Sequence, residues 1–480
     1  MAKLKLKAKD IRAAGYPESP VISVAIQVME KHYKHTKEEK VMEILKAVLA
    51  SPADYLDDAV LQLIARKLVP EQPVEGQEIS LNKTGIHFNV FGNAFIEPAA
   101  MNQMYQVAKL PVSVAGALMP DAHAGYGLPI GGVLAVDNAV IPYGVGVDIG
   151  CRMSLSVFDI DPHELLQKEP SFVRMLQENT LFGSGREFTV ATEHEVLDRE
   201  EFGDTTLLKK LQYKAAKQLG SSGSGNHFAE FGIVEVKEQD EAWGVAPGTY
   251  LGLLTHSGSR ALGANIANHY TRIARSKRRL PGETANLAWL SMEEEEGIEY
   301  WRAMNLAGDY AAACHHVIHE KIAKRLGRRP LSRVENHHNF AWKEWYDGKE
   351  VIVHRKGATP AGKDVLGIIP GSMTAAGYVV KGKGEMAAID SASHGAGRKM
   401  SRSVAANSIT RNRLNELLRK HGVTLLGGGL DEAPDAYKNI DEVMNAQKAL
   451  VDVVASFTPK IVKMDGAVTD RKRGKDAMGE

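Results

Sequence analysis

The spacing of hydrophobic and polar positions changes several times along this 480-residue chain. Between Val21 and Val69, apolar residues recur at the three- and four-residue spacing of an amphipathic helix. The stretch PEQPVEGQ that follows carries the Pro and Gly residues that typically end helices. We therefore predict a helical N-terminal segment over residues 1–80.

From Ile86 to Asp159 the pattern becomes a series of short β-rich runs divided by glycine, such as GGVLAVDNAVI and MSLSVFDI. Further on, TTLLKKLQYKAAKQLG has helical spacing, and TYLGLLTHSGSR is typical of a buried strand that enters a loop and then a helix. Strand, polar loop and helix recur in this way. The pattern predicts a mixed α/β (α+β) body over residues 81–466, followed by a basic polar tail at 467–480.

Two later segments also have helical patterns. The segment from Ala285 to Arg328 is highly charged, and we expect it to lie on the surface with its charges facing solvent. Another helix is expected from about Ser403 to His421.

Composition limits the possible functions. Lys plus Arg and Asp plus Glu number 59 each, so the overall charge does not attract nucleic acid or an anionic membrane, and a polyanion site must be a local patch. No stretch approaches the ~18 consecutive apolar residues of a membrane helix. Two cysteines, Cys151 and Cys314, cannot build a disulfide framework. We expect a cytoplasmic protein without a membrane partner, whose thiols stay reduced.

Several short loops share one form, in which a residue able to bind metal or phosphate stands beside glycine, serine or asparagine at the end of an apolar run. Such loops are where rigid scaffolds display functional groups, and glycine lets the backbone approach a ligand closely. The loops are MPDAHAGYG (Asp121, His123), GVDIGCR (Asp148, Cys151), GSGNHFAEF (Asn226, His227, Glu230), LTHSGSR (His256, Arg260), ENHHNFAW (His337, His338, Asn339), VHRKGAT (His354, Arg355, Lys356) and SHGAGRKMS (His394, Arg398).

The loop GVDIGCR holds Asp148 and Cys151 three residues apart, so their side chains can reach adjacent metal ions. Thiolate and imidazole suit a borderline transition metal, carboxylate and imidazole also suit manganese, and a thiolate can bridge two ions. Taken alone, however, a single cysteine here favours the role of a small buried hydrophobic residue.

The loop SASHGAGRKMS leaves the His394 imidazole uncovered and offers backbone N–H groups to a phosphate, while Arg398 supplies a planar fork for an anion. Histidine can act as a covalent nucleophile in phosphoryl or nucleotidyl transfer. Capping of a helix is the alternative role of His394. Arg355, Lys356 and Ser372 stand in small-residue turns and are either phosphate contacts or solvated turn residues.

Nine motifs occur in the order and approximate spacing of one family: MPDAHAGYGLPIGG, GVGVDIGC, GSGNHFAEF, HSGSRALG, HHNFAW, HRKGAT, IPGSM, HGAGRKMSR and EAPDAYKNIDEVM. Over residues from about Lys83 to Val454, the chain resembles the RtcB family of GTP-dependent RNA 3′-phosphate ligases. The resemblance implies a mixed α/β fold of that family's kind, with a two-manganese centre.

The resemblance also implies roles for individual residues. Cys151 would bridge both ions, His256 and His338 would complete one site, Asp148 and His227 would complete the other, and His394 would become guanylylated by GTP. The residues that match nucleotide-binding positions are Asn226, Glu230, His338, Asn339, Ser372, Arg398 and Tyr437.

The implied reaction opens a 2′,3′-cyclic phosphate to a 3′-phosphate, transfers the guanylate to it and lets a 5′-hydroxyl end displace GMP. RNA with these ends and GTP are the implied partners, together with a possible activating protein.

One position departs from the family pattern. RtcB chains commonly end in a strand followed by Lys-Gly, whose lysine contacts the nucleotide, whereas PKIVKMDG has Asp465 there, with Lys463 as a substitute after a register shift. A guanylate-capping paralogue that does not seal ends efficiently therefore stays an alternative to the ligase. A metal-dependent phosphoesterase and a non-catalytic RNA-binding protein are further alternatives.

Overall fold

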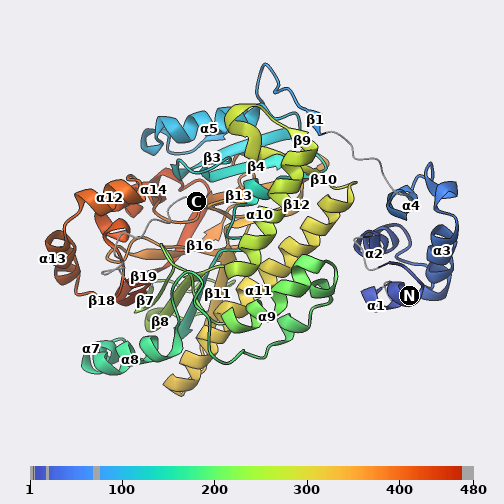
Figure 1. Ribbon diagram of the computed structural model, residues 1–480. Helices are drawn as coiled ribbons and strands as arrows, with labels where there is room; N and C mark the ends of the chain where they lie inside the picture. Colours follow the sequence, from blue (N-terminus) through green and yellow to red (C-terminus); the bar gives the residue numbers. More distant parts are fainter. Residues whose placement is uncertain (1–3, 5, 18–20, 69–75, 467–480) are drawn as a thin grey trace.

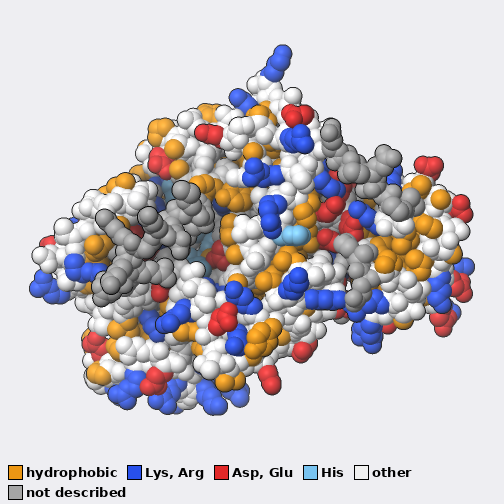
Figure 2. Space-filling view, viewed as in Figure 1, with side chains coloured by type: hydrophobic (Ala, Val, Ile, Leu, Met, Phe, Trp, Pro, Cys, Tyr) orange, Lys and Arg blue, Asp and Glu red, His pale blue; other side chains and the backbone are white. Residues whose placement is uncertain are grey.

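The computed structural model describes residues 4, 6–17, 21–68 and 76–466, and the predicted basic tail at 467–480 lies outside them. The described residues form a mixed α/β structure, as the sequence pattern predicts (Figure 1). No helix in these ranges has both the length and the hydrophobicity that crossing a lipid bilayer requires. Basic and acidic side chains are interspersed over the face shown in Figure 2, in keeping with their equal numbers.

The largest sheet is antiparallel along its main path and almost closes on itself. In spatial order its strands are β11 (Ser332–His337), β6 (Arg152–Phe158), β8 (Gly248–Ser257), β7 (Phe228–Val236), β19 (Val451–Met464), β16 (Gly377–Gly382) and β15 (Leu366–Ile369), with β18 (Thr424–Leu426) parallel to β19. The amide of Asn336 on β11 connects the two end strands, because it donates to the Ile368 carbonyl at 3.2 Å and accepts the Ile368 N–H at 2.9 Å. The side chain thus substitutes for a missing backbone pairing.

A second sheet packs beside the first. Its strands, in order, are β12 (Asn339–Tyr346), β13 (Lys349–Lys356), β4 (Ile130–Val136), β3 (Ser113–His123) and β2 (Phe88–Val90). Only His338 separates β11 from β12, so the chain passes directly from one sheet to the other at this residue. Two-stranded pairings join β1 (Gln77–Glu78) to β9 (Arg278–Arg279), β5 (Ala139–Val140) to β10 (Leu290–Ser291), and β14 (Ala358–Pro360) to β17 (Ser391–Ser393).

Helices surround the two sheets (Figure 1). They are α5 (Pro98–Ala108), α6 (Pro142–Val145), α7 (His163–Gln167), α8 (Glu169–Asn179), α9 (Thr206–Gln218), α10 (Arg260–Lys277), α11 (Glu295–Leu326), α12 (Arg402–Ser408), α13 (Arg411–His421) and α14 (Ile440–Ala446). The predicted helix before the Gly/Ser cluster is α9, and the predicted succession of strand, loop and helix is β8 followed by α10.

Helix α11 contradicts the surface position expected for Ala285–Arg328. Most of its residues are buried, and Tyr300 and Tyr310 are completely inaccessible in the largest hydrophobic core. The acidic run at its start suggested a solvated face, but the apolar residues that follow lie on several sides of the helix. A helix that is apolar on several sides is buried.

The helix expected from Ser403 to His421 is also divided into two, α12 and α13. Thr410 starts the second, since its hydroxyl accepts the Arg413 N–H at 3.2 Å. Threonine is a favoured N-cap residue, which explains the new helix start at this position.

The N-terminal helices form a hydrophobic core of their own, which confirms the helical prediction for the described residues. They are α1 (Ala8–Ala13), α2 (Val21–His32), α3 (Glu38–Ala50) and α4 (Gln62–Leu68). Helix α2 packs against α11, and Lys67 Nζ lies 2.8 Å from Glu295 Oε2. The domain boundary near residue 80 stays a prediction.

Candidate functional site

Strand ends of the largest sheet meet at one edge and carry a cysteine and three histidines. Arg152, the first residue of β6, pairs with Ser257 of β8 and with His337 of β11. His256 of β8 pairs with Phe228, the first residue of β7. Strand pairing therefore places residues far apart in sequence side by side. At these ends, or one residue beyond them, stand Cys151, His227, His256 and His338.

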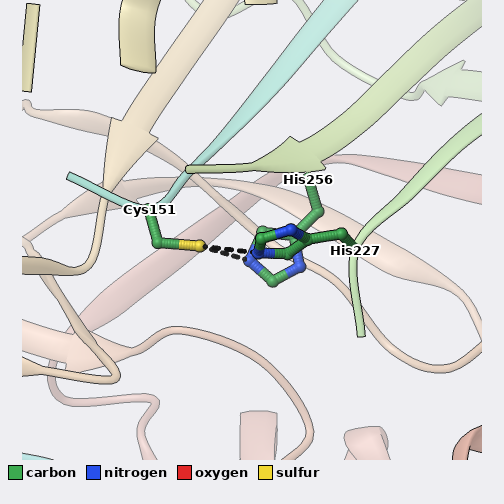
Figure 3. Close-up of side chains that lie close together, drawn as sticks. All are labelled: Cys151, His227 and His256. Atoms are coloured by element: carbon green, nitrogen blue, oxygen red, sulfur yellow. Dashed lines mark hydrogen bonds between the residues drawn. The ribbon is translucent and has the colours of Figure 1, made fainter. Parts of the chain in front are cut away.

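The cysteine faces two of these histidines directly. Cys151 Sγ lies 3.4 Å from His227 Nε2 and 3.2 Å from His256 Nε2, and both rings point their Nε2 atoms at the sulfur (Figure 3). All three residues are buried. A buried group of one thiol and two imidazoles this close together can hold a metal ion.

Two further predicted ligands adjoin this group. His338 Nε2 lies 3.2 Å from His256 Nε2, and Asp148 Oδ2 lies 3.0 Å from His227 Nε2. The structure therefore brings together all five side chains that the sequence resemblance assigned to the two-metal centre.

Surrounding contacts orient these ligands. His256 Nδ1 lies 3.1 Å from the Asn226 carbonyl, so Nδ1 is the donor and Nε2 keeps its lone pair toward the sulfur. The buried Nδ1 atoms of His227 and His338 have no hydrogen-bond partner among the described residues. These residues therefore fit a metal centre by the chemistry and direction of their donor atoms.

Electrostatics at the site favour neutral imidazoles. Burial lowers the pKa of His256 and of His338 well below the ordinary histidine value. Burial, together with the neighbouring Asp148 carboxylate, raises the pKa of the Cys151 thiol well above its usual range. Ionisation of this thiol therefore requires a compensating positive charge, which a metal ion supplies.

His394 lies at the same site, and its imidazole is held by a buried carboxylate. Asp121 Oδ2 accepts from His394 Nδ1 at 2.7 Å and from the His394 backbone N–H at 3.1 Å. The Asp121 side chain is completely buried, and the His394 and His338 ring centroids are 4.9 Å apart. In a neutral imidazole, this contact places the proton on Nδ1 and the lone pair on Nε2.

A cluster of charged and polar side chains holds Arg398. Arg398 Nη1 donates to Glu432 Oε2 at 3.2 Å and to the Tyr437 hydroxyl at 3.3 Å, and its guanidinium carbon lies 5.1 Å from the Tyr437 ring centroid. Arg402 also donates to Glu432. Tyr437, placed in the sequence only by its surrounding motif, thus lies beside Arg398.

All of these groups except Asp121 line one cavity of about 810 Å³. The predicted nucleotide-binding residues that line it are Asn226, Glu230, His338, Asn339, Ser372, Arg398 and Tyr437. Burial raises the pKa of Glu230 well above its ordinary value. Asn339 also connects two loops, since its Oδ1 accepts the Gly357 N–H at 2.8 Å and its Nδ2 donates to the Asp148 carbonyl at 3.4 Å.

Successive side chains of a strand point to opposite faces, so in two pairs of neighbouring residues only one member lines the cavity. Lys356 lines the cavity, whereas the phosphate contact considered for Arg355 is wrong: this side chain is buried and forms two hydrogen bonds with Glu344, at 2.6 and 2.9 Å. On β19, Met464 lines the cavity, while Lys463 donates to backbone carbonyls at the end of α8. Lys463 therefore does not replace the family's C-terminal lysine.

Sequence reasoning missed the roles of Asp121 and Glu432. Asp121 was visible as the first polar residue of a glycine-rich loop, but its partner His394 is 273 residues away. Glu432 ends a 3₁₀ turn (Leu430–Glu432) and is the first residue of the EAPDAYKNIDEVM motif. Both are buried carboxylates whose importance depends on the partner, and the sequence gives no direct sign of that partner.

Comparison with known proteins agrees with this geometry. The family model described as tRNA-splicing ligase RtcB matches residues 103–465. The tRNA-splicing ligase RtcB of Thermococcus kodakarensis is 31% identical over 476 residues, which cover 82% of this chain and 98% of that protein. The RNA-splicing ligase RtcB of Escherichia coli K12 is 32% identical over 394 residues, covering 75% and 92%. That of Mycobacterium tuberculosis H37Rv is 33% identical over 426 residues, covering 74% and 98%. The chain therefore belongs to the RtcB family of RNA-splicing ligases.

Proposed function

We propose that this chain is a GTP- and manganese-dependent ligase that joins RNA 3′-phosphate or 2′,3′-cyclic phosphate ends to 5′-hydroxyl ends. The single observation that carries the proposal is His394, held at Nδ1 by a buried Asp121 and standing next to a cysteine and histidine group that can hold metal. A histidine fixed in this way is suited to nucleophilic attack, since Nε2 keeps its lone pair.

In the first step, His394 Nε2 forms a bond to the α-phosphorus of GTP, and the bond to the departing pyrophosphate breaks. Asp121 keeps the proton on Nδ1 and stabilises the positive charge that develops on the ring, as a carboxylate does for a catalytic histidine elsewhere. The product is a guanylylated His394.

The guanylate takes the buried part of the cavity. Glu230, 4% exposed, offers a carboxyl group to the base, and Arg398 and Ser372 offer donors to the phosphate. The contacts of Arg398 with Glu432 and Tyr437 hold its guanidinium in position, so little side-chain entropy is lost on binding.

Asp148, Cys151, His227, His256 and His338 would hold two manganese ions. When bound, manganese offsets phosphate charge and polarises the phosphorus centre that is attacked. The five residues supply a mixed set of sulfur, nitrogen and oxygen ligands, and the Asn226 carbonyl keeps the His256 lone pair directed at the group.

The later steps act on RNA. Water opens a cyclic phosphate by breaking its bond to the 2′-oxygen. An oxygen of the 3′-phosphate attacks the guanylate phosphorus and breaks its bond to His394. The 5′-hydroxyl of the second strand then attacks the RNA phosphorus, loses its proton and displaces GMP.

A second candidate is a capping enzyme that stops at the guanylylated RNA end. It is favoured by Asp465 at the position of the family's C-terminal lysine and by Lys463, which is bound to carbonyls at the end of α8 rather than facing the cavity. This candidate shares the chemistry of His394 and differs only in the last step.

One experiment separates these candidates. The protein is incubated with α-labelled GTP and manganese, and then with RNA strands that carry a 3′-phosphate and a 5′-hydroxyl. The ligase predicts an acid-labile protein label that is lost in His394→Ala and kept in His421→Ala, an exposed histidine on α13, followed by sealed RNA. Label that reaches the RNA without sealing identifies the capping enzyme. Absence of protein label contradicts both.

A further inference from the structure

The cavity has an exposed aromatic side chain at its mouth. Tyr126 lines the cavity, yet 70% of its surface is exposed. It stands in the short loop between β3 and β4. A large aromatic ring in solvent contributes little to folding, and beside a reaction site it is available to stack on a ligand.

The backbone of this loop is fixed on both sides of the ring. The Ala124 N–H donates to Glu97 Oε1 at 2.6 Å, and the Gly125 N–H donates to Gln103 Oε1 at 3.0 Å. Gln103 Nε2 returns a hydrogen bond to the Gly125 carbonyl, and Lys356 Nζ donates to the Tyr126 carbonyl. The ring is therefore exposed on a restrained backbone rather than on a free loop.

Neighbouring groups extend this surface. Tyr143 lies beside Tyr126 on the cavity wall, with Lys356 Nζ 5.1 Å from the Tyr143 ring centroid. Val147, the residue before Asp148, is 39% exposed and lines the same cavity. Apolar surface and one cationic side chain thus adjoin Tyr126, and this combination suits a base attached to a phosphate backbone.

The residues that line the cavity differ in exposure. Glu230 is 4% exposed and Phe457 is 1% exposed, whereas Tyr126 is open to solvent. The proposed function places the guanylate against the buried residues. A polynucleotide must leave the cavity through an open part, and aromatic rings are the usual platforms for unpaired bases.

We propose that Tyr126 stacks on the nucleobase next to the reacting end of the RNA and so positions that end before His394. This inference rests on the proposed function, because it takes RNA as the substrate and places the guanylate against the buried residues around Glu230. Stacking of one base on an aromatic ring contributes enough that loss of the ring weakens RNA affinity on the order of tenfold.

The test measures RNA binding without GTP, so it does not depend on catalysis. Two oligonucleotides carry the fluorescent base 2-aminopurine, one at the last nucleotide of a 3′-phosphate strand and one at the first nucleotide of a 5′-hydroxyl strand. Each is titrated with the wild-type protein and with Tyr126→Ala, Tyr126→Phe and Tyr213→Ala. Tyr213 on α9 is a matched control, because it is 69% exposed and does not line the cavity.

We expect quenching of at least one strand by the wild-type protein, and the strand that responds identifies the end that Tyr126 holds. Tyr126→Ala loses the quenching and binds that strand about tenfold more weakly, while Tyr126→Phe and Tyr213→Ala behave like the wild type. Equal fluorescence and affinity for wild type and Tyr126→Ala, or no quenching by the wild type, overturns the inference. Absent guanylylation with intact quenching would contradict the proposed function instead.

Discussion

Two groups of buried histidines lie on opposite faces of strand β8, and their ring nitrogens have different partners. On one face is the cavity cluster, which consists of Cys151, His227, His256 and His338. On the other is the helix cluster, which consists of Thr255 and Ser257 of β8, Ser156 of β6, and His315 and His319 of α11.

Every ring nitrogen of the helix cluster has an ordinary hydrogen-bond partner. His315 lies 2.6 Å from the Thr255 hydroxyl and 3.1 Å from the Ser257 carbonyl. His319 lies 2.8 Å from the Thr255 hydroxyl and 2.7 Å from the Ser156 hydroxyl. These two histidines have the fully bonded environment that buried polar groups require, and no further ligand is needed.

The cavity cluster is different, because its nitrogens meet each other and a sulfur. Two Nε2 atoms, of His256 and His338, lie 3.2 Å apart, and two Nε2 atoms lie within 3.4 Å of Cys151 Sγ. Lone pairs that converge in this way repel unless a proton or a metal ion lies between them. Burial and residue type are shared by both clusters, so the kind of partner atom is what distinguishes a metal centre from a structural network.

The largest expected effect is on the guanylylation rate, and it distinguishes the two buried cysteines. Cys151→Ala removes the shared sulfur of the cavity cluster and is expected to lower the rate of manganese-dependent guanylylation by roughly 10³-fold or more, since metal binding contributes several kcal/mol to such reactions. Cys314→Ala, in the buried part of α11, leaves the rate per folded molecule unchanged. Quantifying labelled protein tests this contrast, and equal rates for the two variants would refute it.

Asp121→Asn tests how His394 is held. Asparagine has nearly the same shape, but its amide carries no negative charge to stabilise a positively charged ring. Its NH₂ group can also donate to Nδ1 and so favour the tautomer with the proton on Nε2. We expect guanylylation to fall on the order of 10²- to 10³-fold with the fold intact. Single-turnover labelling together with circular dichroism checks this, and a wild-type labelling rate would show that the carboxylate does not orient the nucleophile.

Substitution in the helix cluster is expected to change stability instead of chemistry. His319→Ala leaves the buried hydroxyls of Thr255 and Ser156 with fewer partners and lowers the free energy of unfolding by about 1–3 kcal/mol. Urea unfolding measures this, with exposed His421→Ala as the control that changes little. Loss of guanylylation by folded His319→Ala, without loss of stability, would reverse the assignment of the two clusters.

The smallest effect is the pH dependence of the helix cluster. Burial lowers the pKa of His315 to about 4, below the ordinary value of about 6.5 that the unfolded chain keeps. The unfolded chain therefore binds the proton more readily, and stability falls as the pH drops from about 6.5 toward 4. Between pH 7.5 and 5.5 the wild type is expected to lose roughly 1 kcal/mol more than His315→Gln. Equal losses would show that His315 does not titrate in this way.

The sequence predicted what is local and missed what depends on packing. The strand, loop and helix around His256 follow from nearby residues, and so does the glycine-rich setting of Cys151. The meeting of these loops depends on strand register, which periodicity does not determine. The contact of Asp121 with His394 and the burial of α11 were missed for the same reason, because each depends on segments distant in sequence.

The measurement that most directly tests the cavity cluster is equilibrium binding of Mn²⁺, followed by the electron paramagnetic resonance of free manganese in titrations of wild type, Cys151→Ala and Cys314→Ala. The wild type and Cys314→Ala are expected to bind two ions per chain, and Cys151→Ala to lose at least one or bind both much more weakly. Identical binding by all three proteins would contradict the assignment of Cys151, His227, His256 and His338 as a metal centre.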